Sequence, residues 1–95
     1  MRGVERDLLA DALGIGWKGK GRRPWRNRTA HNTRNPTTTE LHESLAGAGH
    51  LVEDPAEHYG RMRVYRVTTT GAEAIGKRLP RNLRDLVPED KAAIH

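Results

Sequence analysis

The fold is decided by the stretch Arg61-Met62-Arg63-Val64-Tyr65-Arg66-Val67-Thr68, in which side chains of different character alternate. Alternation of this kind places odd- and even-numbered side chains on opposite faces of a β-strand. Residues 54–60, which precede this stretch, are rich in turn formers, and a shorter strand candidate, Leu51-Val52-Glu53, lies before them. The pattern therefore predicts an antiparallel hairpin between residues 51–53 and 62–68.

Helical patterns flank this hairpin on both sides. Thr37-x-x-Glu40 and Thr70-x-x-Glu73 both have the spacing of a capping box, which marks the start of a helix. They predict helices over residues 38–48 and 71–79. Nearer the N-terminus, apolar residues recur at helical spacing and predict a helix over residues 4–13 that Gly14 ends. Residues 81–95 form a C-terminal tail in which one short helix is possible.

A basic loop separates the first two predicted helices, over residues 15–36. Closely spaced glycines and two prolines argue against a regular element in this stretch. It contains no acidic residue and two interleaved tryptophans, Trp17 and Trp25. For the tryptophans we favour packing against a core that lacks Phe, with stacking on nucleic-acid bases as the alternative. The cations of this loop are Lys18, Lys20, Arg22, Arg23, Arg26, Arg28 and Arg34.

These elements define an α+β fold in the order helix, long basic loop, helix, two-stranded hairpin, helix. A chain of 95 residues allows one domain, which we place at residues 1–80. The core should be small, because the chain contains no Phe and is 31% charged.

The charge balance points to an anionic partner. The formal net charge is +5, and it is distributed in blocks, with basic residues 15–39 and 61–79 on either side of an acidic stretch at 40–60. Such a balance is typical of nucleic-acid binding, although it also serves solubility. Salt-dependent contact with phosphates through the basic loop and hairpin is the functional prediction, with duplex DNA favoured.

Several other classes of function are not expected. The absence of cysteine excludes disulfides and thiolate metal sites, and it fits a reducing cytoplasm. The five histidines have no spacing typical of zinc ligands, so no metal is expected. Nucleophile and phosphate-loop motifs are missing, and we expect neither an enzyme nor a cofactor. No apolar run is long enough for a membrane span.

Part of the sequence resembles a known family of regulators. The run Leu41-x3-Leu45-x3-Gly49-His50-Leu51-Val52, continued to Thr68-x2-Gly71, resembles the C-terminal half of a winged helix of the MarR and PadR types. This resemblance implies a winged-helix-like fold in which residues 38–48 form the recognition helix and the hairpin forms the wing. Wing cations commonly contact the nucleic-acid backbone, and protection of a strand edge is the alternative. The cations in question are Arg61, Arg63 and Arg66.

A second resemblance covers more of the chain. Leu9-x2-Ala12-Leu13-Gly14, Pro24-Trp25-Arg26-Asn27-Arg28 and Val67-Thr68-x2-Gly71 resemble segments of short phage and prophage proteins with an aromatic-Arg-Asn motif. The resemblance implies an origin in a phage or mobile element, and hence the cytoplasm of a bacterial host. It implies no mechanism.

The exposed face of the predicted recognition helix is acidic. With Leu41 and Leu45 directed inward, Glu40, His42 and Glu43 are left facing solvent. Two carboxylates would be repelled by phosphates, so this helix is a poor reader of a DNA groove. The alternatives to nucleic-acid binding are an interaction module for a host or virion protein and a structural part of a virion.

Overall fold

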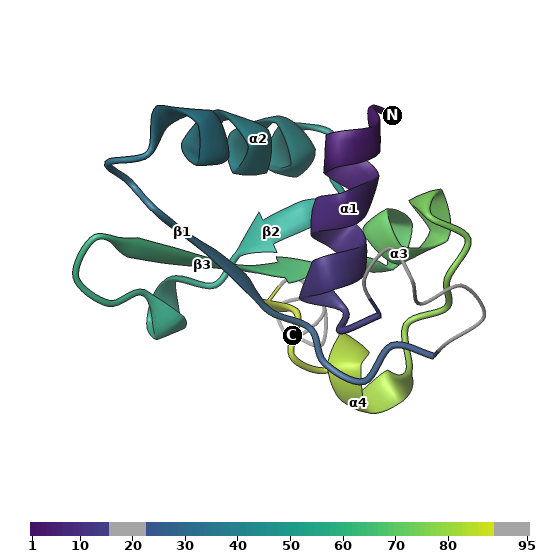
Figure 1. Cartoon of the computed structure of the whole chain (residues 1–95). Helices are drawn as coiled ribbons and strands as arrows, with labels where there is room; N and C mark the ends of the chain where they lie inside the picture. Colours follow the sequence, from purple (N-terminus) through teal and green to yellow (C-terminus); the bar gives the residue numbers. More distant parts are fainter. Residues whose placement is uncertain (16–22, 89–95) are drawn as a thin grey trace.

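The structure is a computed structural model, and it describes residues 1–15 and 23–88. Helices and strands alternate along the chain, with one short 3-10 helix, η1 (Figure 1). In chain order the elements are α1 (Gly3–Ala12), β1 (Thr29–Asn32), α2 (Pro36–Gly47), β2 (Leu51–Glu53), η1 (Pro55–Glu57), β3 (Met62–Val67), α3 (Thr69–Ala74) and α4 (Arg81–Arg84).

The strands form a three-stranded antiparallel sheet in the order β1-β3-β2. Leu51 pairs with Val67 and Glu53 pairs with Tyr65, so the predicted hairpin of β2 and β3 is confirmed. On the other edge of β3, Thr29 pairs with Tyr65 and Asn32 pairs with Met62. The α+β class is therefore confirmed, and β3 is the central strand of the sheet.

The prediction of one irregular loop over residues 15–36 was wrong for its last part. Residues 29–32 form β1, although Thr29-Ala30-His31-Asn32 shows no apolar alternation. The physical reason is the open edge of β3, whose backbone donors and acceptors need partners when the strand is buried. Pairing with a strand distant in sequence overrides the weak local preference of β1.

The predicted helices are present, but two of the predicted capping residues were wrong. Asn35 caps α2, and its side chain accepts a hydrogen bond from the Thr38 N–H at 3.1 Å. Thr68 caps α3, and its hydroxyl accepts from the Gly71 N–H at 3.0 Å. Both helices thus begin earlier than the capping-box patterns indicate. The third helix also ends earlier than predicted, because Gly76 takes a positive φ of 71° directly after its last turn.

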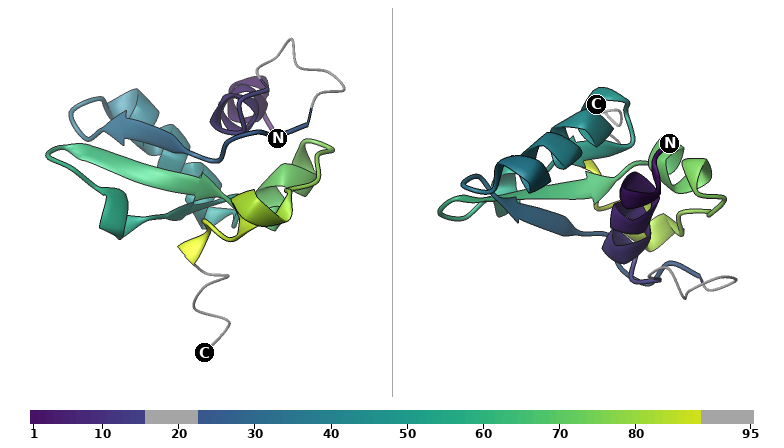
Figure 2. Two further views of the ribbon diagram at one scale, coloured as in Figure 1. Left: turned by 90° about the horizontal axis from the view of Figure 1, so that it is seen from below. Right: turned by 45° about the horizontal axis from the view of Figure 1, so that its top comes forward.

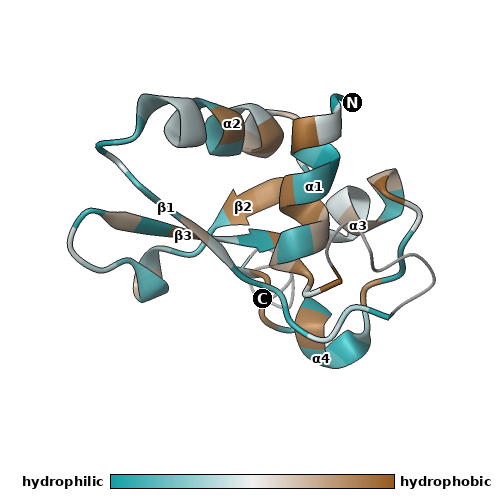
Figure 3. Cartoon of the chain, viewed as in Figure 1, coloured by the Kyte–Doolittle hydropathy of each residue, from teal (hydrophilic) through white to brown (hydrophobic). Residues whose placement is uncertain are grey.

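The helices surround the sheet unevenly. α2 packs along β1 and β2, α1 contacts β1 and β3, and α3 follows directly from the end of β3 (Figures 1 and 2). Apolar residues are concentrated in β2, in parts of α1 and in α4, whereas the loop between β2 and β3 is largely hydrophilic (Figure 3). Buried residues from the whole length of the described chain, including Leu9, Leu45 and Leu83, form one core cluster.

Candidate nucleic-acid interface

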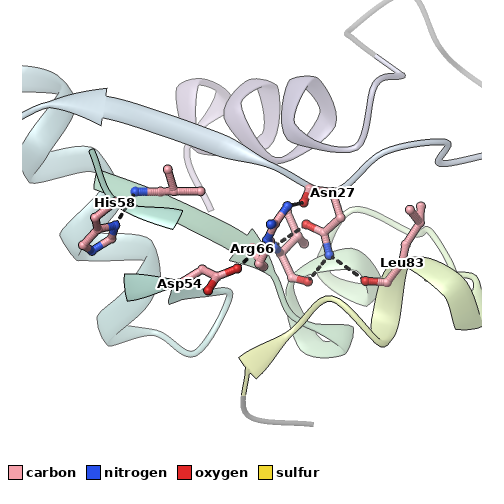
Figure 4. A network of polar contacts seen from close by, with 7 residues as sticks. Asn27, Asp54, His58, Arg66 and Leu83 are labelled. Atoms are coloured by element: carbon pink, nitrogen blue, oxygen red, sulfur yellow. Dashed lines mark hydrogen bonds and ion pairs between the residues drawn. The ribbon is translucent and has the colours of Figure 1, made fainter. Parts of the chain in front are cut away.

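A buried asparagine joins three segments that lie far apart in the sequence. Asn27 is only 1% exposed and precedes β1 by two residues. Its Nδ2 donates to the Val67 carbonyl at 2.9 Å and to the Leu83 carbonyl at 3.3 Å, and its Oδ1 accepts from the Val67 N–H at 2.6 Å (Figure 4). The side chain therefore fixes the position of α4 relative to the end of β3.

Arg66 belongs to the same buried network. Its Nε lies 3.0 Å from Asp54 Oδ2, and its Nη1 donates to the Asn27 carbonyl at 2.7 Å (Figure 4). Both charged side chains are buried, because β3 is the central strand and is covered at this point. Removing one member of such a pair would leave the other charge uncompensated. Arg66 is thus a structural residue at the end of the hairpin, so we leave it out of the candidate interface.

The neighbouring Trp25 and Arg26 hold the end of α1. The Trp25 indole Nε1 donates to the Gly14 carbonyl at 2.6 Å, and Arg26 Nη2 donates to the Asp11 carbonyl at 2.6 Å. The Asp11 carbonyl lies in the last turn of α1 and also accepts from the Gly14 N–H, while the Gly14 carbonyl lies just beyond the helix. The two side chains therefore tie residues 25 and 26 to the C-terminal end of α1. Trp25 nevertheless remains 67% exposed, unlike the core packing that we favoured for it. The Trp25-Arg26-Asn27 motif therefore joins the end of α1, through Trp25 and Arg26, to β3 and α4, through Asn27.

A basic groove lies next to this anchor, between residues 23–24 and residues 76–84. Its volume is about 570 Å³. Five cationic side chains line it, and no acidic side chain does so among the described residues. Like charges gathered around a concave surface raise the local concentration of anions. We call this site the basic groove, and its lining consists of Arg23, Pro24, Gly76, Lys77, Arg78, Leu79, Pro80, Arg81 and Arg84.

The backbone beneath the groove is held in place. α3 ends in a Schellman motif, in which the Lys77 N–H donates to the Ala72 carbonyl and the Gly76 N–H donates to the Glu73 carbonyl, both at 2.9 Å. Leu79 and Leu83 are buried in the core cluster on either side of Pro80. The backbone that carries these cations is therefore held in place by contacts within the fold.

A second group of cations lies at the far end of the sheet, in the turns beside β1 and β3. The Thr33 N–H donates to the Arg61 carbonyl at 3.0 Å, which brings the turn holding Arg34 next to the hairpin tip. Arg34 and Arg61 are exposed, whereas Arg63 is half-buried and donates to the Gly60 carbonyl at 3.1 Å. We call Arg34, Arg61 and Arg63 the hairpin-end cluster.

The structure thus divides the predicted binding residues among several places. Arg23 lines the basic groove, Arg28 is exposed beside the start of β1, and Trp25 and Arg26 are hydrogen-bonded at the C-terminal end of α1. Three residues of the hairpin and the β1–α2 turn form the hairpin-end cluster. Lys18, Lys20, Arg22 and Trp17 lie outside the described residues.

The sequence analysis missed most of the basic groove. Lys77, Arg78, Arg81 and Arg84 were not proposed as binding residues. Arg81 and Arg84 lie beyond the domain boundary drawn at Pro80, and Lys77 and Arg78 lie in the helix predicted over residues 71–79. The signal was nevertheless present, since residues 76–84 contain four cations and no carboxylate. Leu83 and Val87, both in the predicted tail, are buried in the core cluster.

A buried aromatic cluster lies away from the groove, between β1, α2 and β3. The ring centroids of His31 and His42 are 4.6 Å apart, and those of His42 and Tyr65 are 5.2 Å apart. Although the sequence placed His42 on the solvent face, its ring is buried, and Nδ1 donates to the Thr38 carbonyl at 2.8 Å. Burial lowers the pKa of His42, with a further contribution from His31. Burial, reinforced by Glu53, raises the pKa of Tyr65 to about 12.

Other kinds of site find no support in the described part of the chain. Within residues 1–15 and 23–88, no three His, Cys, Asp or Glu side chains are grouped so that they could hold a metal ion. None of the helices in these ranges is both long and apolar enough to cross a membrane.

Comparison with known proteins finds no matching family model, no matching curated protein and no matching solved structure.

Proposed function

We propose that this protein binds nucleic acid by holding phosphates in the basic groove. The observation that carries the proposal is the lining of that groove, in which five cations are gathered without an acidic side chain among the described residues. Neutralisation of phosphates by such side chains releases condensed counterions and favours binding. Because Asn27 and the buried leucines fix the groove, little ordering of the backbone is needed on binding.

The hairpin-end cluster supplies a second set of contacts in this proposal. Arg34 and Arg61 are exposed there, and a long strand could reach them after leaving the groove. The acidic face of α2, with Glu40 and Glu43 exposed, is turned away from the nucleic acid. The protein would then contact phosphates through loops and turns, and it would not insert α2 into a groove of DNA.

A winged-helix-like arrangement is consistent with this proposal. The strand order is β1-β3-β2, α2 lies between β1 and β2 in the chain, and β2 and β3 form the hairpin that would serve as the wing. One helix, α2, connects β1 to β2, where a winged helix-turn-helix has two. We therefore propose a reduced winged helix of phage or mobile-element type, in which the groove beside α4 replaces the recognition helix.

The salt dependence of binding tests the proposal. The full chain is titrated with a fluorescent oligonucleotide at several salt concentrations, together with an Arg78→Ala/Arg81→Ala/Arg84→Ala variant. Loss of three phosphate contacts should flatten the slope of log K against log salt by roughly two to three units, since each contact contributes about 0.7–0.9. Arg6→Ala, which removes an exposed cation from α1 outside the groove, is the control for loss of charge elsewhere and should bind like the parent.

Two outcomes would contradict the proposal. Equal slopes for the triple variant and the parent would show that phosphates do not occupy the groove. Absence of binding to duplex DNA, single-stranded DNA and RNA at low salt would reject nucleic acid altogether.

Protein binding is the second candidate function, and one surface favours it. A depression of about 370 Å³ lies between α1 and α2, and Val4, Leu8 and Ala30 supply apolar lining while Asp7 and Asp11 are acidic. Val4 is 55% exposed and adds accessible apolar surface to this depression. A partner with a basic and apolar segment would fit this surface. Binding of nucleic acid that depends on the basic groove would disfavour this function as the primary one.

A further inference from the structure

The basic groove has apolar walls as well as cations. Pro24, Leu79 and Pro80 contribute to its lining between the arginines. The backbone of a duplex presents mainly phosphate and sugar to a protein, whereas an unpaired strand also presents the faces of its bases. A groove that is both cationic and apolar matches the mixed chemistry of the unpaired strand.

Trp25 adds an exposed aromatic ring at the position next to the groove residue Pro24, although the ring does not itself line the groove. It follows Pro24 in the chain, so the two backbones are one residue apart. The indole N–H, its only donor, is satisfied by the Gly14 carbonyl, and the guanidinium of Arg26 lies 5.3 Å from the ring centroid. The ring is thus held in one orientation while two thirds of the residue remains exposed.

This combination is unusual for a tryptophan with a purely structural role. A Trp that only fills space would be buried, because its large apolar surface gains free energy by leaving water. At position 14, a side chain would overlap the indole, so Gly14 allows the ring to lie close against the backbone. The contact positions the ring without covering it.

We propose that the basic groove and Trp25 together bind an unpaired strand of DNA or RNA. One base stacks on the exposed part of the Trp25 indole, and the adjacent phosphates enter the groove between Arg23 and the cations of residues 77–84. Stacking on an aromatic ring tolerates every base, so binding should show little sequence preference. This inference rests on the proposed nucleic-acid function and narrows it to single strands.

The test compares single strands of equal phosphate charge that differ in their bases, and it adds a duplex, whose charge is about twice as large. The full chain is titrated by fluorescence anisotropy with a labelled twelve-nucleotide oligothymidylate, the same backbone without bases, an oligouridylate and a duplex of twelve base pairs. Oligothymidylate should bind roughly 5- to 150-fold more tightly than the abasic strand, the range expected for stacking of one base. It should also bind more tightly than the duplex, and oligouridylate should behave similarly to oligothymidylate.

Two substitutions at one position separate stacking from structure. Trp25→Phe and Trp25→Leu both lose the hydrogen bond to Gly14, but only Phe retains an aromatic face. Trp25→Leu should bind oligothymidylate no better than the abasic strand, while Trp25→Phe should keep most of the difference. Thermal melts of both variants are compared first, so that loss of binding is read only from folded protein.

The outcomes distinguish this inference from the function on which it rests. Equal binding of the abasic strand and oligothymidylate by the parent protein, or tighter binding of the duplex, would overturn the single-strand inference and leave phosphate binding intact. Absence of binding to all four probes would overturn both. The parent protein alone decides between these results, so the proposal remains testable even if both variants unfold.

Discussion

The amide side chain of Asn27 holds β3 and α4 to the segment that precedes β1. All of its contacts are to backbone groups, one N–H and two carbonyls, and they lie 40 to 56 residues away in the sequence. A hydrocarbon side chain of similar size could not satisfy these groups. Asn27 therefore contributes through hydrogen bonds that no local pattern in the sequence indicates.

Replacing Asn27 with Ala should lower the free energy of unfolding by about 2–4 kcal/mol. Without the Asn27 amide, the Val67 N–H and the carbonyls of Val67 and Leu83 lose their hydrogen-bond partner. Each fully buried group left in this way costs roughly 1–3 kcal/mol. Urea denaturation measures the change, and Asn82→Ala, at an exposed position of α4, is the control. A loss below about 0.5 kcal/mol would show that other groups can replace the amide.

His42 makes the stability of the fold depend on pH. Its pKa in the folded protein is lowered by burial, whereas in the unfolded chain it lies near the ordinary value of about 6.5. The unfolded state therefore binds a proton more readily below that pH. The contribution of His42 to stability is complete above about pH 6.5 and declines as the pH falls.

The free energy of unfolding should accordingly decrease between pH 7 and pH 5, and a His42→Phe variant should show a smaller decrease. Phe keeps an aromatic ring beside His31 and Tyr65 but cannot take up a proton. Urea titrations of both proteins at pH 5, 6 and 7 measure the two slopes. Parallel slopes would assign the acid sensitivity to another group.

At the scale of elements, helices α1 and α2 end in the same way. In each, a glycine with positive φ follows the last turn, Gly14 at 78° and Gly49 at 81°, and backbone hydrogen bonds close a Schellman motif. The two glycines differ in their surroundings. A Cβ atom at Gly49 would meet nothing within 4 Å, while one at Gly14 would overlap the Trp25 indole.

Gly49→Ala and Gly14→Ala should therefore destabilise the protein to different extents. The left-handed backbone alone costs about 1–2 kcal/mol for a residue with a Cβ atom, and Gly49→Ala should lose that amount. Gly14→Ala should lose more, because the Trp25 ring must also move and its hydrogen bond to the Gly14 carbonyl is weakened. Thermal unfolding of the two variants measures the difference. Equal losses would show that the ring adjusts freely.

The sequence predicts elements whose signals are local. Alternation along residues 62–67 and the apolar spacing of Leu41 and Leu45 are sufficient to predict β3 and α2. β1 could not be predicted in this way, because His31 is buried by neighbours from α2 and β3. The burial of Arg66 could not be predicted either, because the alternation along residues 61–68 does not show that Asp54 is its ion-pair partner.

At the scale of the whole molecule, the candidate site also depends on contacts between segments that are distant in the sequence. The cations of residues 76–84 are visible in the sequence, but their proximity to Arg23 depends on how Asn27 fixes α4. The charge blocks predict an anionic partner, but the basic block at residues 61–79 ends within the groove. A surface assembled from distant segments is determined by packing, which charge counting does not describe.

The central position of β3 also governs how the chain can fold while it is being made on the ribosome. Synthesis proceeds from the N-terminus, and β1 emerges more than thirty residues before β3, its only partner strand among the described residues. β2 likewise has no partner until β3 follows it. Until then the first half of the molecule can form helices but no sheet, and closing such long loops slows folding. The sheet therefore cannot form until residues 62–67 have left the ribosome, and the basic groove cannot form until residues 76–84 have followed.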